Sequence, residues 1–564
     1  MTAAARPADA PHAPARTPGH GSAPSAVPLL LRGADVVDGT GGPRFRADVL
    51  VREGRIESIG RRPGELSVPA GSRVVEAEGQ VLSPGFIDLH SHADLRILIE
   101  RTHPSRITQG FTTEVLGQDG LSYAPVTDAV LPQLRGKIAG WNGDPEGFDW
   151  SWRSVAGYLD RLDAGIATNA CYLVPHGSIR AVAAGWGEGA LTPSQLRTMQ
   201  ELLARGMDEG AVGLSTGLTY TPAMYADRAE LTALCEVLAS RGGFFSPHTR
   251  SYGAGALEAY REVLGLARAT GCAVHLTHAT MNFPPNTGRA PELLAEVDAA
   301  LADGCDITLD TYPYLSGATT LAAVLPSWAS AGSVEDTLAR LADPAALARI
   351  REALEVTGSD GCHGVTADWD TIEISGVAHP ELAHRVGRTL AQIAAQEGRD
   401  PFDVLVDQLI RDRLGTGILQ HVGHEENVRA IMRHPAHLVG SDGLLVGAKP
   451  HPRAWGTCAQ LLGRYVRELG ILSLEEAIAH LTGNAARRLR LRERGLVREG
   501  FAADLVLFDP TSIAAGATYA EPRRPATGLS FVFVNGHAAL EDGEPTGALG
   551  GRALRLRDGQ VAAR

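Results

Sequence analysis

The sequence predicts an α/β protein built on a (β/α)8 TIM-like barrel, with a small β-sandwich made from both chain ends and an inserted subdomain. Three observations predict this fold. Apolar segments of strand length alternate with amphipathic helical patterns through the middle of the chain, as in a closed parallel barrel. Short β-type segments split by turn residues occur near both ends but not between them. About 120 residues separate the last two barrel strands, which is more than a single crossover helix needs.

The two ends of the chain share a pattern of short strands and tight turns. From residue 29 to 81 the segments LLLRGADVV, ADVLVREGRIESIG and SRVVEAEG follow one another, with Glu53-Gly54 typical of a hairpin turn. ADLVLFDP and GLSFVFVNGHAALEDG repeat the pattern near the other end, with Asn535-Gly536 as the turn. We therefore expect residues 29–81 and 491–564 to form one β-sandwich.

Residues 82–490 are expected to form the barrel. Its eight strands are predicted at LSPGFIDLHSH, TTEVLG, ATNACYLVPHG, AVGLSTGL, GGFFSPHTR, CAVHLTHAT, CDITLDTYPY and HLVGSD. Helix-start signals lie between the strands, including Asp400-Pro401 and the capping box of Ser473 and Glu476. The long gap before the last strand contains helical patterns and a β-like stretch, and we assign about 316–380 to a subdomain inserted over the barrel mouth.

Composition narrows the class of protein. The chain has 564 residues, of which 44% are hydrophobic, so most of it is not disordered; residues 1–28, with six prolines, are expected to be a disordered tail. The net charge of -13, with no basic run to offset it, argues against nucleic acid or an anionic membrane surface as a partner. No segment has the 18 or more apolar residues of a membrane span or resembles a secretory signal, and the six cysteines lie far apart, so we expect a reducing, cytoplasmic location. The oligomeric state is not predicted.

Histidines and acids fall where the predicted barrel strands end, which is where barrel enzymes place their catalytic groups. Residues two apart on a strand point the same way, so an HxH pair at the end of the first strand directs both imidazoles into the mouth. Each residue alone has an ordinary explanation, such as a solvated strand end or a turn. Six such residues fall at predicted strand ends: His90, His92, Asp119, His248, His278 and Asp442. The ordinary explanations do not predict that all six lie there, so the sequence predicts that they form a metal site.

The chain resembles a known family over nearly its whole length after the tail. PGFIDLHSH is similar to the metal-binding opening of the metal-dependent amidohydrolase superfamily, which combines such a barrel with a split β-sandwich. GLTYTPAMYA, SPHTRSYG, DTYPYLSGATTL, LVGSDG and HPRAWGTCAQLLGRYVRE are similar to motifs of the D-aminoacylase, or N-acyl-D-amino-acid deacylase, family. HPRxWGT followed by LGRYVRE is the most specific of these.

The resemblance implies a zinc enzyme with one tight metal site and a second, weaker one. In that family the tight zinc is held by a cysteine after the second strand and by two histidines, here His248 and His278, while His90 and His92 make the weaker site. The family cysteine lies in a GNCG segment, but this chain reads GQDG, so Asp119 stands where the thiolate would be. A carboxylate also binds zinc, so this departure preserves a metal site but leaves open which metal is preferred and how many metals bind.

The lysine content separates subfamilies. Hydantoinases and dihydroorotases of the superfamily bridge two metals with a carbamylated lysine at a strand end. The two lysines of this chain, Lys137 and Lys449, do not occupy such a position, which excludes a lysine-bridged site. A carboxylate bridge through Asp119 or, less favoured, Glu114 remains open; the alternative for Glu114 is a strand residue salt-bridged inside the barrel.

The parts of such a site predict the mechanism, because zinc lowers the pKa of a bound water and polarises the scissile carbonyl. Asp442 is expected to take a proton from water and pass it to the departing amine, which is otherwise too poor a leaving group. Ser215 in GLSTG is similar to a nucleophile elbow, but no Ser-His-Asp order supports that interpretation. The predicted activity is zinc-dependent hydrolysis of N-acyl-D-amino acids to a carboxylate and a free D-amino acid. The alternatives are hydrolysis of another linear or cyclic amide, such as a dipeptide or hydantoin, and a non-catalytic barrel used for binding.

A free substrate carboxylate requires a polar or cationic clamp. By resemblance, Tyr220, Tyr312 and Arg453 match family residues at the substrate. A family lysine and a family serine are replaced by Thr280 and Ala318. Arg250 is a candidate to compensate, because a guanidinium binds a carboxylate bidentately; a salt bridge within the mouth is the alternative for this residue.

Overall fold

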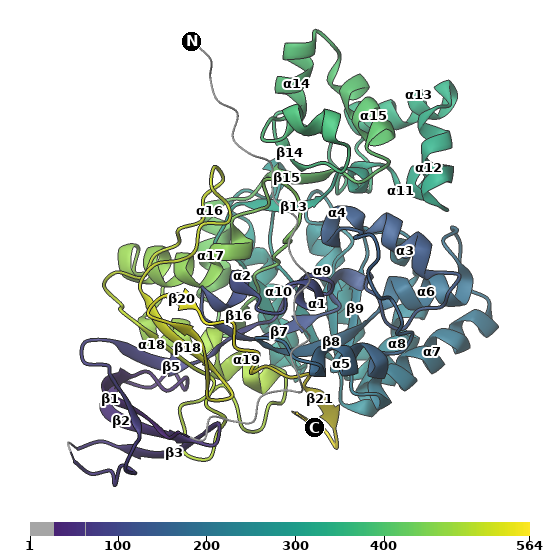
Figure 1. The fold of residues 1–564 in the computed structure, drawn as a ribbon. Coiled ribbons are helices and arrows are strands. Elements are labelled where there is room, and N and C mark those ends of the chain that lie inside the picture. The colour runs from purple at the N-terminus through teal and green to yellow at the C-terminus, as the bar shows by residue number, and fades with distance from the viewer. Residues whose placement is uncertain (1–26, 63, 564) are drawn as a thin grey trace, which may run out of the picture.

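The computed structural model describes residues 27–62 and 64–563, so the tail expected over residues 1–28 lies almost wholly outside the described part. Its centre is a barrel of eight parallel strands (Figure 1). A backbone hydrogen bond of 3.1 Å from Leu89 to Val439 and a bridge between Ser91 and Gly443 join the first strand to the last. In spatial order the strands are β6 (Phe86–Asp88), β7 (Phe111–Leu116), β8 (Asn169–Pro175), β9 (Gly213–Gly217), β10 (Phe244–His248), β11 (Ala273–Leu276), β12 (Ile307–Thr311) and β16 (His437–Val439). The predicted barrel and its eight strand segments are confirmed.

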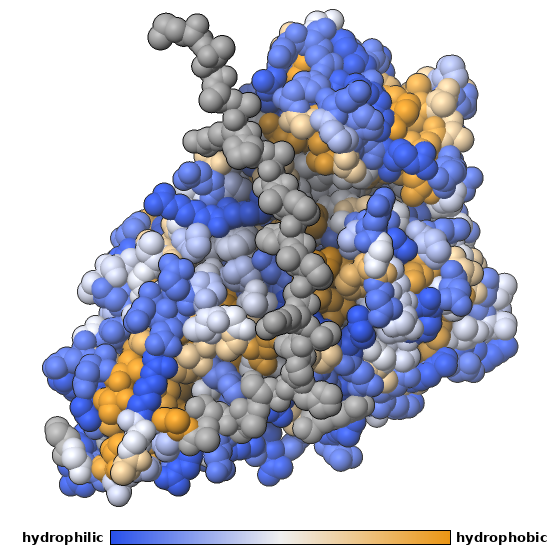
Figure 2. Space-filling view, viewed as in Figure 1, coloured by the Kyte–Doolittle hydropathy of each residue, from blue (hydrophilic) through white to orange (hydrophobic). Residues whose placement is uncertain are grey.

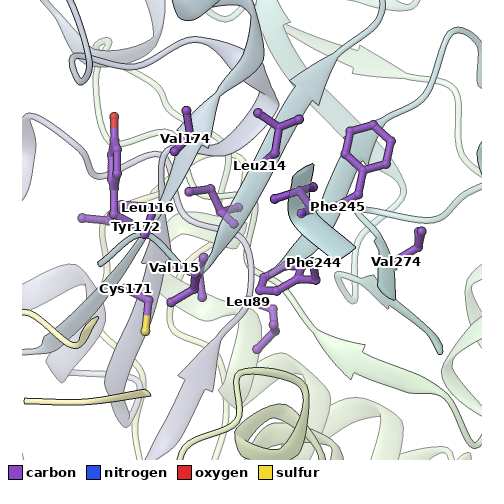
Figure 3. Packing of buried hydrophobic residues seen from close by; sticks show 14 of the residues in the cluster. Leu89, Val115, Leu116, Cys171, Tyr172, Val174, Leu214, Phe244, Phe245 and Val274 are labelled. Atoms are coloured by element: carbon purple, nitrogen blue, oxygen red, sulfur yellow. The ribbon is translucent and has the colours of Figure 1, made fainter. Parts of the chain in front are cut away.

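The barrel strands are apolar because both of their faces are covered. Every residue of β7 and β8 is buried. Neighbouring side chains such as Val115 and Leu116, or Cys171 and Tyr172, point to opposite faces of the strand (Figure 3). Polar residues are therefore concentrated where the strands end.

Helices surround the barrel and begin at the expected signals. Thr192 and Gln195 form a capping box at the start of α7 (Pro193–Asp208), and Ser473 and Glu476 form the predicted one at the start of α18 (Leu474–Leu481). The covering helices are α5 (Val155–Asp163), α6 (His176–Ala184), α7 (Pro193–Asp208), α8 (Arg228–Arg241), α9 (Ala256–Thr270), α10 (Ala290–Ala302), α16 (Glu425–Met432), α17 (Arg453–Gln460), α18 (Leu474–Leu481) and α19 (Gly483–Arg488). Four shorter helices lie after the first and second strands: α1 (Arg96–Ile99), α2 (Pro104–Ile107), α3 (Leu131–Lys137) and α4 (Ala139–Asn142).

The two chain ends meet in one nine-stranded sheet. β5 (Val81–Pro84) lies at the seam, parallel to β1 (Leu29–Val36) on one side and antiparallel to β17 (Leu505–Phe508) on the other. The predicted turns Glu53-Gly54 and Asn535-Gly536 have positive φ at both residues, as a two-residue hairpin requires. The strands are β1 (Leu29–Val36), β2 (Phe45–Arg52), β3 (Arg55–Gly60), β4 (Arg73–Glu76), β5 (Val81–Pro84), β17 (Leu505–Phe508), β18 (Leu529–Val534), β19 (His537–Glu541) and β20 (Glu544–Pro545).

Both faces of this sheet are apolar. In β17, Leu505 and Leu507 belong to a cluster within the sheet domain, whereas Val506 and Phe508 pack with residues of α17 and α18. The sheet is thus joined to the barrel through its second face. Within the segment expected to complete the sandwich, the last two strands, β21 (Arg555–Arg557) and β22 (Gln560–Ala562), pair with each other instead. Buried Arg555 holds them to the barrel through a 2.7 Å salt bridge with Asp163 of α5.

The inserted segment forms a separate lobe above the barrel (Figure 1). Its antiparallel sheet, in the order β13 (Ser316–Thr320), β15 (Gly417–His421) and β14 (Ile372–Gly376), carries its own apolar core with α11 (Ser327–Ser330), α12 (Val334–Leu341), α13 (Pro344–Glu352), α14 (Leu390–Glu397) and α15 (Pro401–Arg411). The lobe therefore continues to residue 421, whereas the sequence indicated about 316–380. The helix predicted from Asp400-Pro401 packs on this core rather than on the barrel, a difference that amphipathic periodicity does not reveal.

Most of the lobe's surface in Figure 2 is hydrophilic, with a few orange areas. Leu315 at its edge, Val356 and Ile410 are among the exposed large hydrophobic side chains. Across the described residues, no helix is both long enough and apolar enough to cross a membrane.

Candidate metal centre

The loops after the first and last barrel strands are tied together by a buried aspartate. Asp88 Oδ1 accepts hydrogen bonds from the backbone N–H of His90 (3.1 Å) and of Ser441 (2.7 Å). The N–H of Asp442 in turn donates to the carbonyl of His90 (2.8 Å). These bonds hold His90 and Asp442 side by side at the mouth.

Asp119 is presented by a tight turn after β7. Gly117, Asp119 and Gly120 all have positive φ, at 79°, 52° and 73°. A side chain at Gly117 would place its Cβ 2.3 Å from the carbonyl oxygen of Leu173, so glycine is needed there for space as well as for conformation. The Gln118 side chain donates to the carbonyl of Leu89 (2.6 Å) and fixes the turn against the first strand.

The structure brings all six predicted residues together as two overlapping groups. The ligand atoms of each group lie within 4.8 Å of one another. Asp119 belongs to both, because its two oxygens lie 3.4–3.6 Å from imidazole nitrogens of four histidines. One group is His90, His92, Asp119 and Asp442, and the other is Asp119, His248 and His278.

The spacing of the nitrogens fits a bound metal ion. Nε2 of His90 and Nε2 of His92 are 3.2 Å apart, and Nδ1 of His248 and Nε2 of His278 are 3.1 Å apart. Two imidazoles bound tetrahedrally to zinc at about 2.0–2.1 Å have nitrogens roughly 3.3 Å apart. Asp119 Oδ1 is buried and has no hydrogen-bond partner among the described residues. A buried oxygen without a partner is energetically unfavourable, and a bound cation would remove that penalty. The donor set of imidazoles and carboxylates therefore suits one or two divalent metals.

Charge and burial set the protonation of the centre. Burial acts to raise the pKa of Asp442, but the Arg453 guanidinium and the neighbouring imidazoles outweigh it and hold that pKa well below its usual range. The surrounding histidines likewise depress the pKa of Asp119 against the effect of burial. Burial lowers the pKa of His90 to about 4, so this imidazole is neutral and able to bind a metal.

Neighbouring side chains orient the histidines. The hydroxyl of Thr219 lies 2.7 Å from Nε2 of His248, which leaves Nδ1 to face the centre. Trp141 packs its ring 5.5 Å from that of His92, and Tyr220 packs its ring 4.9 Å from that of His248. An aromatic wall thus borders the centre on the side of Tyr220.

Glu114 takes no part in either group. Its carboxylate accepts hydrogen bonds of 2.7 Å from both Ser91 and Thr168 and forms a 2.9 Å salt bridge with His103. The structure thus favours the alternative given for this residue, a salt-bridged strand residue within the barrel.

A cavity opens from the centre towards the inserted lobe. Tyr220 and Tyr312, both expected at the substrate, line it, as do Thr280 and Ala318. The other lining residues include Asp119, His248, His278 and Asp442 of the centre, with Tyr252, Asn282, Phe283, Gly317, Thr319, His363, Gln420 and Val422.

Arg453 lies directly behind this cavity. It is fully buried and binds Asp442 Oδ2 at 2.9 Å, with its guanidinium 4.4 Å from the centre of the Tyr312 ring. It is not among the lining residues, but its contacts Asp442, Tyr312 and Ala318 are. Its Nε and Nη1 have no hydrogen-bond partner among the described residues.

Arg250 is directed elsewhere. Its guanidinium pairs with Glu262 (2.8 Å) and donates to the carbonyls of Met224 and Ala226, and it is not among the residues that line the cavity. The structure therefore does not support Arg250 as a carboxylate clamp and favours the salt-bridge alternative.

Several lining residues were not singled out from the sequence. His363, Gln420 and Thr319 come from the inserted segment, where no barrel-strand position marks them. His363 has positive φ and lies between the rings of Tyr252 and Phe283. The GCHG segment, in which glycines flank Cys362 and His363, is the one sequence signal that could have drawn attention to it.

Comparison with known proteins identifies the family. A family model described as "Amidohydrolase family" matches residues 73–538. The chain belongs to the amidohydrolase family. The resemblance noted in the sequence is thus confirmed, and relatives within the family are similar over nearly the whole chain.

Two curated amidohydrolases come from Alcaligenes xylosoxydans xylosoxydans. An N-acyl-D-glutamate deacylase is 35% identical over 95% of this chain and 97% of its own length. A D-aminoacylase is 33% identical over 93% of this chain and 97% of its own length.

Solved amidohydrolase structures show the same arrangement of the chain. N-acyl-D-glutamate deacylase from Bordetella bronchiseptica, complexed with zinc and a phosphonate that mimics the tetrahedral intermediate, is 34% identical with a TM-score of 0.79, covering 94% of this chain and 99% of that one. A D-aminoacylase structure concerned with a binuclear metal centre is 33% identical with a TM-score of 0.78 and the same coverage. Both of these solved relatives thus have a metal site.

Proposed function

We propose that this amidohydrolase cleaves the amide bond of N-acyl-D-amino acids, releasing a carboxylate and a free D-amino acid. The observation that carries the proposal is the buried cluster of four imidazoles and two carboxylates at the barrel mouth, open to a cavity and backed by an arginine. The named activities of the similar deacylases support the choice of substrate.

The metal in this proposal is zinc. Asp119, His248 and His278 would hold it tightly, and His90 and His92 would form a weaker site that shares Asp119. Zinc supplies a lowered pKa for coordinated water and polarises a substrate carbonyl.

Asp442 is the proposed acid and base. Its Oδ2 is held by Arg453, and its Oδ1 lies 3.2 Å from Nε2 of His92, so the carboxylate is fixed in the centre and kept deprotonated. A carboxylate in that state can accept a proton from water and then deliver it to the amide nitrogen, which leaves as an amine.

Tyr220, Tyr312 and Arg453 are the proposed substrate contacts. The two tyrosines line the cavity from different elements, and Arg453 has two unused donors next to Tyr312. A buried guanidinium with unused donors is suited to a substrate carboxylate, because charged hydrogen bonds are the strong ones. Thr280 and Ala318 contribute no further charge to this end of the cavity.

A panel of acylated amino acids tests the proposal. Purified protein is assayed for amine release from N-acetyl-D- and N-acetyl-L-amino acids, after metal chelation and again after zinc is restored. We expect turnover of D substrates that is lost on chelation and recovered with zinc. Hydrolysis of a hydantoin or a dipeptide, without amine release from N-acetyl-D-amino acids, would contradict the proposal and indicate an amidohydrolase for another amide. Zinc binding without turnover of any amide would indicate a binding protein.

A further inference from the structure

A second cavity lies beside the metal centre, on the other side of Tyr220. Tyr220 lines both cavities. Thr219 and Trp141 also line the second one, and these are the residues that contact His248 and His92. Tyr220 is the one residue common to both linings, so the second cavity borders the metal centre at this side chain.

Lys137 brings a positive charge to this cavity. It is the last residue of α3 and lines the cavity together with Ser330 of the inserted lobe. Its Nζ makes a single hydrogen bond among the described residues, a long one of 3.4 Å to the carbonyl of Ser330, and lies 5.2 Å from the centre of the Trp186 ring. Burial, with nearby Arg340 adding to it, lowers the pKa of Lys137 to about 8.

Among the described residues, the lysine salt bridge is that of Lys449 with Glu373, and no carboxylate forms one with Lys137, although Asp336 is near enough to act against the lowering of its pKa. The nearby acid Asp336 accepts hydrogen bonds from the N–H and the hydroxyl of Ser333, as the cap of α12. A buried ammonium without an acidic partner is costly, and an anionic ligand would remove that cost.

The rest of the lining suits a carboxylate on an aliphatic chain. The Ser330 hydroxyl is buried and has no partner among the described residues, so it is free to donate. Further hydroxyl side chains in the lining are Thr221, Thr320, Ser327 and Thr337, and its aliphatic part consists of Leu121, Met224, Ala322, Ala323, Leu325 and Leu414.

The placement of the cavity indicates which part of the substrate would enter it. Arg453 and Tyr312 lie at the first cavity, with Thr280 and His363, and they account for the amino-acid half. The acyl half of the substrate would then extend past the Tyr220 side chain into the second cavity. We propose that the Lys137 cavity receives a carboxylate at the far end of the acyl chain, so that the preferred substrates are D-amino acids acylated by a dicarboxylic acid. This inference rests on the proposed deacylase function.

A series of acyl groups on one D-amino acid tests the inference. Malonyl, succinyl, glutaryl and adipoyl derivatives of D-leucine are compared with their terminal methyl esters. We expect one acid of the series to exceed its ester by ~10- to 100-fold in kcat/KM, the range of one charged hydrogen bond. Lys137→Met should remove that advantage while leaving hydrolysis of N-acetyl-D-leucine unchanged, and Lys137→Arg should restore part of it. Lys449→Met is the matched control, because the other lysine of the chain pairs with Glu373 at 2.8 Å and does not line this cavity.

Three outcomes would overturn the inference. The first is a ratio of kcat/KM between acid and ester near one for every chain length, and the second is a ratio that Lys137→Met leaves unchanged. Either result would show that the Lys137 cavity does not bind an acyl carboxylate. If Lys137→Met instead lowered only the preference for N-acetyl-D-glutamate over N-acetyl-D-glutamine, the cavity would bind the side chain of the amino acid and not the acyl group.

A binding measurement separates this inference from the deacylase proposal. If no N-acyl-D-amino acid is hydrolysed, the proposed function fails, but free glutarate can still be titrated while tryptophan fluorescence is followed, since Trp141 lines the cavity and Trp186 packs on Lys137. Saturable quenching in wild type that is lost in Lys137→Met would support an anion site, and no difference between the two would overturn it.

Discussion

Replacing Asp442 by asparagine is expected to have two separable effects. Asparagine keeps the size of the side chain but cannot accept a proton, so kcat should fall by ~10² or more, in line with general acid–base catalysis. The second effect concerns stability. Arg453 is fully buried and loses the charge that it binds at 2.9 Å, and breaking a buried ion pair from one side costs about 3–5 kcal/mol.

The geometry also predicts what should not change. Asp442 Oδ1 lies 3.2 Å from His92 and 3.7 Å from His90, and these two histidines belong to the proposed weaker site. Asp442 is not in the group formed by Asp119, His248 and His278. Tight metal binding should therefore persist in the variant, even if loading of the weaker site falls.

Three measurements on one set of variants test this reasoning. Steady-state kinetics give kcat, elemental analysis gives metal content, and urea unfolding gives stability, for Asp442→Asn, Arg453→Met and the double variant. The double variant should recover most of the lost stability, because no unpaired charge remains, while kcat stays low. Near-native kcat in Asp442→Asn would mean that another group moves the proton, and loss of the tight metal would refute the division into two groups.

Three further predictions concern the turn, the metal and the fold. Asp119→Cys should tighten zinc binding and narrow metal tolerance, because a thiolate is the softer ligand; equal activation of both proteins by manganese would count against this. Gly117→Ala should lower metal loading measured by elemental analysis, since its Cβ would lie 2.3 Å from a carbonyl oxygen of β8, whereas Gly147→Ala, with a similar positive φ and nothing within 4 Å, should not. Glu230→Gln should destabilise the protein by about 3 kcal/mol at pH 7, because it leaves Arg180, which is 1% exposed, without its charged partner. Burial acts to raise the pKa of Glu230, but hydrogen bonds from His176 and Arg180 of α6 outweigh it and lower that pKa in the folded protein. The stability that Glu230 contributes is therefore fully present above the pKa of about 4.3 in the unfolded chain, and it is lost as pH falls through the lower pKa of the folded protein. A difference in stability between wild type and variant that did not shrink below about pH 4 would contradict this.

The fold was largely predictable because its signals are local. Each barrel strand is a short apolar segment that ends in polar residues, and the hairpin turns and helix caps need particular residues at fixed positions. The extent of the inserted lobe was underestimated for the same reason. α15 is amphipathic in the way that a barrel helix is, and only its partners, such as the packing of Phe402 and Leu405 in the lobe's core, show where it belongs.

The candidate site was predictable only where strand ends define it. The six residues of the two groups follow barrel strands, so their convergence could be expected before any coordinates. Arg250 also follows a strand, but its partner Glu262 lies on α9. The sequence does not show whether this arginine binds a substrate carboxylate or the carboxylate of a residue on a neighbouring helix. His363 and Gln420 reach the cavity through folding of the inserted lobe, which is a long-range arrangement that no local pattern encodes.

The position of Asp119 ties the two metal groups together. Its Oδ1 faces His90 and His278, and its Oδ2 faces His92 and His248, so each oxygen lies between one histidine of each pair. A change at residue 119 therefore alters both groups, whereas a change at a single histidine alters one. Glycines with positive φ lie on both sides of the Gln118-Asp119 pair, and neighbouring backbone leaves no room for a side chain at Gly117 or Gly120, so the turn that presents Asp119 depends on both glycines. If the proposed function is correct, we therefore expect the identity of this one side chain, rather than the number of histidines, to set the metal preference and the coupling of the two proposed sites.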